Sequence, residues 1–295
     1  PTADAPTGAP GSPVTRMTET PRFPDFFVVG APRCGTTAFC RYLARNPQIC
    51  FSRPKEPHYF TRLHQDPSAD ELRRDYLDRC FGHCTAEHRA LGEGSVSYLY
   101  LPDTLERIRR FNPDARFIAL VRNPLGMLPS YHLRMRFLLQ EDEPDFGKAW
   151  ALEPTRARGD RVPRHCLDPR LLRYSQVARL GAQVERLFAV AGRDRSHVIV
   201  YDDLVADAPG VYRRALEFLA VDHDGQIVVG LLELVEHGQS IHAGHHDVHD
   251  GRVERHGTGK VQPFGPAGRQ PDLVPLGREQ RLEDLPHDFF VVDDE

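Results

Sequence analysis

The chain has 295 residues, with 38 Lys and Arg against 42 Asp and Glu, and a formal net charge of −4. Hydrophobic residues make up 40% of it and charged residues 27%, a balance that excludes both a wholly disordered chain and a membrane bundle. The length suits one large or two small domains with a buried core.

The negative charge is concentrated towards the C-terminal end. Residues 222–295 carry 15 acidic and six basic side chains, which leaves residues 1–221 with a net charge of +5. That body contains no dense Lys/Arg stripe interleaved with aromatic residues, so the composition favours a small anionic ligand over a nucleic acid. We expect no nucleic-acid partner.

The apolar runs are too short to cross a membrane. The longest of them, such as 26–30 and 117–121, have the length of strands, and no charged start precedes a long apolar segment. We therefore expect no integral membrane association and a cytoplasmic location. Residues 1–24, rich in Pro, Ala, Thr and Gly, are predicted to be a flexible leader, followed by an α/β domain over 25–221. Residues 222–295 form an acidic, His/Gly-rich region whose structure the pattern does not define.

Strands and helices alternate along residues 25–221. Short apolar runs predict strands at 25–30, 48–52, 116–121 and 197–201. Apolar residues at helical spacing predict helices at 36–46, 72–81, 103–111, 125–139, 146–152, 171–190 and 209–219. This alternation is typical of a parallel sheet with right-handed crossovers.

Cysteine and histidine patterns do not predict a metal site. Cys80 and Cys84 would share a helical face, but no second half-site is evident, so ordinary packing is favoured. A His-rich stretch at 241–256 allows zinc binding as an alternative to a solvated tail. Gly244 and Gly251 make a stable helix there doubtful, and no tetrahedral set of ligands emerges.

The segment Gly30-Ala-Pro-Arg-Cys-Gly-Thr-Thr37 joins the first predicted strand to the first predicted helix. A glycine-bearing turn at a helix N-terminus offers backbone N–H groups and a positive dipole end to an anion. The spacing of Gly30 and Gly35 matches the nucleotide loop G-x-x-x-x-G-K-[ST], but Thr36 stands in place of the Lys, and Arg33 supplies the cation. A tight turn without a ligand is the structural alternative.

A second motif, Arg116-Phe-Ile-Ala-Leu-Val-Arg-Asn-Pro124, ends a predicted strand in Arg122 and is followed by Ser130. A Mg²⁺-dependent nucleotide enzyme commonly has an Asp at such a strand end. A guanidinium with a nearby hydroxyl instead suits capture of a second phosphate, although Arg122 could merely cap a helix. Together the two motifs predict a doubly phosphorylated nucleotide bound without metal.

With Lys55-Glu-Pro-His-Tyr-Phe60 between these motifs, the sequence resembles the PAPS-dependent sulfotransferases, particularly the branch of bacterial carbohydrate and heparan sulfate glucosaminyl sulfotransferases. The likeness covers roughly residues 26–221 and includes Gly92-Glu-Gly-Ser-Val-Ser-Tyr98. It implies an α/β fold, a P-loop-like three-layer domain with a central parallel sheet flanked by helices. It also implies PAPS as co-substrate, PAP as product and no required metal.

The resemblance also implies roles for individual residues. Glu56 aligns with the catalytic carboxylate and is expected to be the general base, with His58 assisting or orienting it. The structural alternative for Glu56 is an ordinary surface carboxylate that pairs with Lys55. The 5′-phosphosulfate loop and the 3′-phosphate motif give the predicted nucleotide contacts, which are Arg33, Cys34, Gly35, Thr36, Thr37, Arg122 and Ser130.

The sequence departs from that family at three positions. Arg33 stands where many relatives have a catalytic Lys, and it keeps the charge but is a poorer proton donor. Cys34 falls at a family glycine position, where a small spacer is favoured over a nucleophile. Gly94 replaces a Lys found near the acceptor in the glucosaminyl enzymes, so their acceptor specificity does not carry over.

The expected function is therefore sulfuryl transfer from PAPS to a hydroxyl or amine of a carbohydrate, glycolipid or small metabolite. A P-loop nucleotide kinase and a catalytically silent PAPS-binding protein are the alternatives. The acceptor would be selected by loops that carry no readable code, and the sequence does not indicate an oligomeric state.

Overall fold

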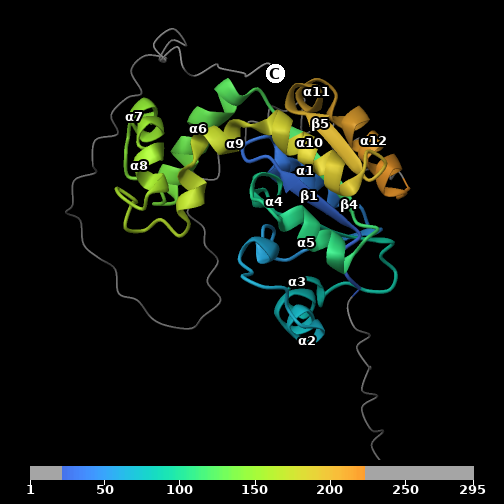
Figure 1. Ribbon diagram of the computed structural model, residues 1–295. Helices are drawn as coiled ribbons and strands as arrows, with labels where there is room; N and C mark the ends of the chain where they lie inside the picture. Colours follow the sequence, from blue (N-terminus) through green and yellow to red (C-terminus); the bar gives the residue numbers. More distant parts are fainter. Residues whose placement is uncertain (1–21, 223–295) are drawn as a thin grey trace, which may run out of the picture. The chain divides into compact units, whose positions relative to one another are not determined.

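Residues 22–222 are described by a computed structural model, in which a five-stranded parallel sheet forms the centre of the α/β fold (Figure 1). The sheet order is β2-β3-β1-β4-β5. The strands are β1 Phe26–Gly30, β2 Ile49–Phe51, β3 Ala90–Gly94, β4 Arg116–Val121 and β5 Ser196–Val200. This architecture confirms the predicted parallel α/β fold.

The central strands β1 and β4 are apolar runs, as expected for strands that helices cover on both faces. All five residues of β1 are buried, and β1 pairs in parallel with β3 (Val28 opposite Gly94) and with β4 (Val28 opposite Ile118). The crossovers from β1 to β2 and from β4 to β5 run in opposite directions. Right-handed crossovers therefore place α1 on one face and α10 on the other.

Helices and short turns connect the strands. The α-helices are α1 Thr36–Leu43, α2 Ala69–Leu72, α3 Asp78–Phe81, α4 Ser97–Tyr100, α5 Thr104–Phe111, α6 Pro124–Phe137, α7 Phe146–Ala151, α8 Glu153–Ala157, α9 Tyr174–Ala178, α10 Leu180–Ala191, α11 Tyr201–Ala206 and α12 Ala208–Leu219. Short turns of other helical types are η1 Tyr59–Thr61, η2 Arg73–Leu77 and η3 Pro169–Leu172. Helix α1 contacts α12, whereas α10 contacts α4 and α5, as expected for two separate helical layers.

Two predicted helices are wrong in detail. The segment 171–190 is not one helix but η3, α9 and α10, because Arg179 leaves the helical region with a ψ of 54°. The segment 72–81 contains a π-helical turn, η2, between α2 and α3. The strand β3 and the short helices α4, α8 and α11 were not among the predicted elements.

A buried carboxyl group, that of Glu93, lies among aromatic side chains of the core. Tyr76, Tyr98 and Phe60 are fully buried, and Glu93 of β3 is 0% exposed beside them. The hydroxyls of Tyr76 and Tyr98 both donate hydrogen bonds to Glu93 Oε2. Burial raises the pKa of Glu93 despite these hydrogen bonds.

Within the described residues, the chain divides into two compact units. The first comprises residues 22–134 and 174–222 and contains the whole sheet. The second comprises residues 135–173, and in it Arg156 makes a buried bidentate ion pair with Glu141, with both N–O distances at 2.6 Å. Pairing of this kind offsets part of the desolvation cost of burying two charges.

Cysteine positions differ from the expectation that Cys80 and Cys84 share a helical face. Cys80 lies in α3, but Cys84 lies beyond the end of that helix and is disulfide-bonded to Cys50 of β2. Cys34, Cys40, Cys80 and Cys166 are free. The predicted leader over 1–24 and the region 222–295, with the His-rich stretch, lie almost entirely outside the described residues.

None of the helices within residues 22–222 combines the length and apolar character needed to cross a membrane.

Candidate active site

The predicted site residues lie in the first compact unit, which contains the whole sheet and is called the sheet unit below. They lie at the carboxyl edge of β3, β1 and β4. The loop after β1 begins where Ala31 N–H donates to Leu120 O of β4, and Arg122 directly follows β4. The backbone of Glu56 is held at the same edge, because its N–H donates to the carbonyl of Gly94 at 2.9 Å. The carboxyl edge of a parallel sheet is where such folds bind ligands.

Helix α1 starts at an N-cap that only glycine adopts easily. Gly35 has a φ of 81°, in the left-handed region, and no side chain caps the helix. The first N–H groups of α1 therefore have no intrahelical acceptor and point towards the loop. Thr36 is buried and Thr37 is exposed at this end. The local geometry can receive an anion.

Arg33 links the two predicted phosphate motifs directly. Its Nε donates to Ser130 Oγ of α6 at 2.8 Å, although the two residues are 97 positions apart. Burial lowers the pKa of Arg33, and the nearby charges of Arg134 and Arg122 lower it further. The positive charges of Arg122 and Arg134 thus disfavour the charge of Arg33, and an anionic ligand would relieve this repulsion.

Arg122 is held by an aromatic ring. Its guanidinium carbon lies 4.4 Å from the ring centroid of Tyr201, the first residue of α11. The same ring limits the space beside Gly35, where an added Cβ would lie 3.3 Å from it. Tyr201 therefore lies between the α1 end of the site and Arg122.

Glu56, Lys55 and His58 form a charged group beside this loop. Lys55 Nζ lies 2.6 Å from Glu56 Oε1, and His58 Nε2 lies 3.7 Å from Glu56 Oε2. Both Glu56 and His58 have positive φ values, 63° and 52°. Such strained backbone is common at functional sites, where the surrounding structure holds it in place.

Two serines that follow β3 orient His58. Ser97 Oγ lies 2.6 Å from His58 Nδ1, and the N–H of His58 donates to Ser95 Oγ at 3.1 Å. With Nδ1 engaged by Ser97, the Nε2 of the imidazole faces Glu56. His58 is thus fixed as a neighbour of the carboxylate.

The carboxylate of Glu56 is ionised at neutral pH. Burial acts to raise its pKa, but the nearby imidazole of His58 and the charge of Lys55 outweigh burial and lower the pKa to about 2. Glu56 can therefore accept a proton without first losing one.

Cys34 and Gly94 have packing explanations. Cys34 is fully buried with its Sγ 3.8 Å from Met127 Sδ, and burial raises the pKa of its thiol to about 12. A protonated, buried thiol is a spacer rather than a nucleophile. At Gly94, an added Cβ would lie 2.7 Å from Cys40 Sγ and 3.2 Å from the Phe51 ring. No side chain fits there without movement of these neighbours.

Sequence reasoning did not assign four residues that the structure brings to the site. They are Ser95, Ser97, Arg134 and Tyr201. The two serines lie in the 92–98 segment already noted for its resemblance, and Arg134 follows Ser130 by one helical turn. Tyr201 directly follows the carboxyl end of a strand. Residues at such positions commonly contact ligands in this kind of sheet, so this position could have indicated Tyr201.

A basic pocket of about 290 Å³ lies in the sheet unit next to the charged group. It runs along α1, β2 and the loop after β2, and its lining includes no carboxylate among the described residues. Its lysine and arginine side chains are Arg41, Arg45, Arg53 and Lys55. Because Lys55 also contacts Glu56, the pocket adjoins the carboxylate.

A model of the sulfotransferase family matches residues 70–225, more than half of the chain. The chain therefore belongs to the sulfotransferase family. This confirms the family predicted from the motifs, and the matched range includes Arg122, Ser130 and the 92–98 segment.

Curated relatives and a solved structure belong to the same family. The chain is 30% identical over 118 residues to heparan sulfate glucosamine 3-O-sulfotransferase 6 of Homo sapiens, covering 40% of this chain and 32% of the relative. It is 28% identical over 150 residues to carbohydrate sulfotransferase 15 of Homo sapiens, covering 37% and 27%. The chain thus spans less than a third of the length of these relatives.

The solved structure is that of a sulfotransferase from Alicyclobacillus acidocaldarius. It is 28% identical to this chain with a TM-score of 0.55, and the match covers 72% of this chain and 91% of that one. The predicted α/β fold is therefore shared with a known sulfotransferase over most of the described residues.

Proposed function

We propose that the protein transfers a sulfuryl group from PAPS to a hydroxyl or amine of a carbohydrate, glycolipid or small metabolite and releases PAP. The observation that carries this proposal is the link from Arg33 to Ser130 beside Arg122, which joins a loop suited to one phosphate with a motif suited to another. A doubly phosphorylated nucleotide complements that arrangement.

PAPS, when bound, supplies an activated sulfuryl group whose departure leaves negative charge on a phosphate. The N–H groups at the start of α1 and the guanidinium of Arg33 are proposed to stabilise that charge. Arg122 and Ser130 are proposed to hold the 3′-phosphate, and Thr36 and Thr37 to contribute hydroxyls at the loop. Cys34 shapes this loop by its bulk.

On the acceptor side, Glu56 is proposed to take the proton from the attacking hydroxyl or amine. Its low pKa keeps it ionised, and His58, fixed by Ser97, helps hold the carboxylate in position. Lys55 belongs both to this group and to the basic pocket, which favours acceptors that carry an anionic group. Acceptor specificity of the glucosaminyl enzymes is not inferred, because Gly94 has no space for their Lys.

Transfer of labelled sulfate from PAPS across a panel of acceptors tests the proposal. The wild-type protein is expected to label at least one acceptor, whereas Glu56→Gln loses transfer but still binds PAP in calorimetry. A protein that binds PAP yet labels no acceptor would instead be the silent PAPS-binding protein. Tight binding of ATP with Mg²⁺, without binding of PAP, would favour a nucleotide kinase. The cytoplasmic location and the absence of a metal requirement stay predictions.

A further inference from the structure

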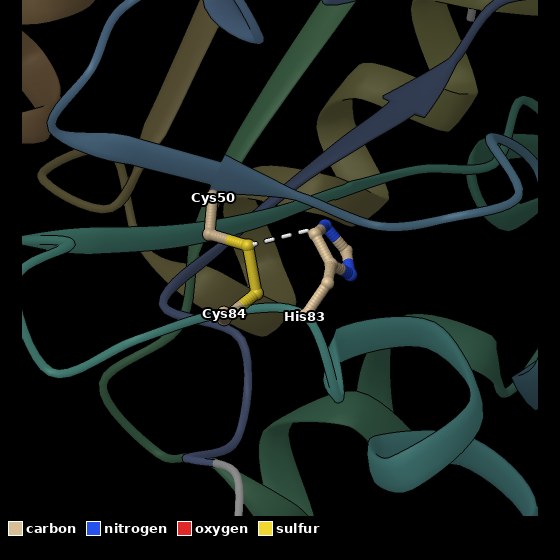
Figure 2. A group of neighbouring side chains, drawn as sticks. All are labelled: Cys50, His83 and Cys84. Carbon is tan, nitrogen blue, oxygen red and sulfur yellow. Dashed lines mark hydrogen bonds between the residues drawn. A yellow bond between two sulfur atoms is a disulfide. The ribbon is translucent and has the colours of Figure 1, made fainter.

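Two sulfur atoms and one imidazole nitrogen meet at the edge of the sheet. The ligating atoms of Cys50, His83 and Cys84 all lie within 4.8 Å of one another. Figure 2 shows the two cysteines joined as a disulfide, with the ring of His83 next to Cys50. The distance from His83 Nε2 to Cys50 Sγ is 3.4 Å. The sequence predicted no metal site here, because helical spacing related Cys84 to Cys80 and no second half-site was evident.

The three residues come from two separate segments. Cys50 lies in β2 and is buried, whereas His83 and Cys84 follow α3, and His83 is exposed. Cys50 and His83 both line the basic pocket. A small ion can therefore reach the group from solvent.

Two thiolates and an imidazole form a ligand set typical of zinc. Tetrahedral coordination, with Zn–S of about 2.3 Å and Zn–N of about 2.0 Å, places a sulfur and a nitrogen ligand about 3.5 Å apart. The 3.4 Å separation of Cys50 Sγ and His83 Nε2 is close to that value. The sulfurs cannot serve as thiolate ligands while they are bonded to each other, so metal binding requires the reduced protein.

We propose that Cys50, Cys84 and His83 bind one Zn²⁺ ion when the disulfide is reduced, with water as the fourth ligand. A small dithiol supplies the two electrons that break the S–S bond and is itself oxidised to a disulfide. The two protein thiols then release one proton each to solvent as the zinc–sulfur bonds form. The site thus exists in two alternative forms, a disulfide and a metal complex.

Both forms would tie the same two segments together. The cross-link spans 34 positions, and the enclosed chain contains Lys55, Glu56 and His58. Reduction without metal removes the cross-link between the ends of this segment, whereas zinc binding restores a cross-link between the same residues. A metal complex therefore replaces the covalent constraint under reducing conditions.

Titration of the full chain with Co²⁺, a spectroscopic substitute for Zn²⁺, tests this site. The reduced wild type is expected to show thiolate-to-cobalt charge-transfer absorption that saturates at one Co²⁺ per chain and disappears on addition of Zn²⁺. The oxidised protein shows none of this absorption. Histidine-only sites, including any in the stretch 241–256, give no thiolate band, so the band reports only the Co²⁺ that thiolates bind.

Variants locate the ligands. The Cys50→Ser/Cys84→Ser double variant is expected to lose the band, and His83→Gln to weaken Co²⁺ binding at least tenfold. Cys166→Ser is the matched control, because it removes a free thiol elsewhere, and it keeps the band. Absence of the band in reduced wild type, or its survival in the double variant, overturns the proposal.

A measurement on the wild type avoids dependence on the folding of these variants. The reduced protein is alkylated with and without Zn²⁺, and the modified cysteines are quantified by mass spectrometry. Zinc is expected to protect Cys50 and Cys84 at least tenfold while Cys166 reacts equally in both samples. Equal alkylation of Cys50 and Cys84 in the two samples refutes the site.

Discussion

Arg122 is expected to contribute more to PAP binding than any comparable arginine outside the site. Hydrogen bonds to charged groups contribute about 1.5–3 kcal/mol net, and 1.4 kcal/mol corresponds to a factor of ten. Arg122→Ala should therefore raise the Kd for PAP about 10- to 150-fold. Arg122→Lys keeps a point charge but loses the planar fork, so a Kd about tenfold above wild type is expected.

A substitution of Tyr201 tests how the positioning of Arg122 contributes to PAP binding, because it leaves the charge of Arg122 in place. The ring lies 4.4 Å from the guanidinium carbon, and a cation–π contact of this kind contributes about 0.5–1 kcal/mol at exposed sites. Tyr201→Leu should therefore weaken PAP binding about two- to fivefold, less than either substitution of Arg122. The order of the three variants tests the reasoning independently of the absolute values.

Arg193 provides a matched control. Its guanidinium carbon lies 4.3 Å from the ring centroid of Phe188, nearly the geometry of Arg122 on Tyr201, but Arg193 precedes β5 and is therefore at the amino end of that strand. Arg193→Ala removes one charge and one cation–π contact and should leave the Kd for PAP within about twofold of wild type. Calorimetry at one fixed ionic strength measures all four variants. Equal Kd values for Arg122→Ala and Arg193→Ala would refute the assignment of Arg122 to the nucleotide.

Three further predictions follow from local geometry. Lys55→Met should raise the pKa of Glu56 from about 2 towards its ordinary value, because the ammonium that favours the carboxylate is lost. The base acts only when ionised, so the acidic limb of the rate profile should move to higher pH, and an unmoved limb contradicts the role of Lys55. Gly35→Ala places a side chain at a φ of 81° and should lower the free energy of unfolding by about 1–2 kcal/mol, measured as a lower midpoint of thermal unfolding. An unchanged midpoint would contradict the expected backbone strain. Burial raises the pKa of Glu93, so the folded state retains a proton that the unfolded state releases as pH rises. Wild-type stability should therefore fall relative to Glu93→Gln as the pH rises above the ordinary carboxyl pKa of about 4, as denaturant midpoints will show, and parallel curves would refute it.

The parts of the fold that could be predicted are those with a continuous local pattern. The strands β1 and β4 are unbroken apolar runs and were predicted within one residue. The strand β3, Ala-Leu-Gly-Glu-Gly, has the composition of a turn. It forms a strand because Gly92 gives space to the ring of Phe26 and Glu93 finds two tyrosine hydroxyls in the core. Both compensations are tertiary, so strand propensity does not reveal them.

The candidate site shows the same division between local and distant information. Arg33, Glu56 and Arg122 lie in motifs that can be read locally, but the contact of His58 with Ser97 joins residues 39 positions apart. The disulfide of Cys50 and Cys84 was missed for the same reason, since helical spacing related Cys84 only to Cys80. Pairings across the sheet depend on strand order, which the pattern of strands and helices alone does not fix.

The surroundings of Glu56 also explain how a weak base can serve in the proposed reaction. A carboxylate with a pKa of about 2 is a poor proton acceptor, and the bond from Lys55 Nζ to Glu56 Oε1 is one cause of that low value. An acceptor hydroxyl that donates to Oε1 must compete with the ammonium of Lys55 for the same oxygen. When an anionic group of the acceptor draws Lys55 towards the basic pocket, the pKa of Glu56 rises and the carboxylate becomes a better base. Basicity would then be gained only when an acceptor is present, and a neutral acceptor should react more slowly than its anionic counterpart.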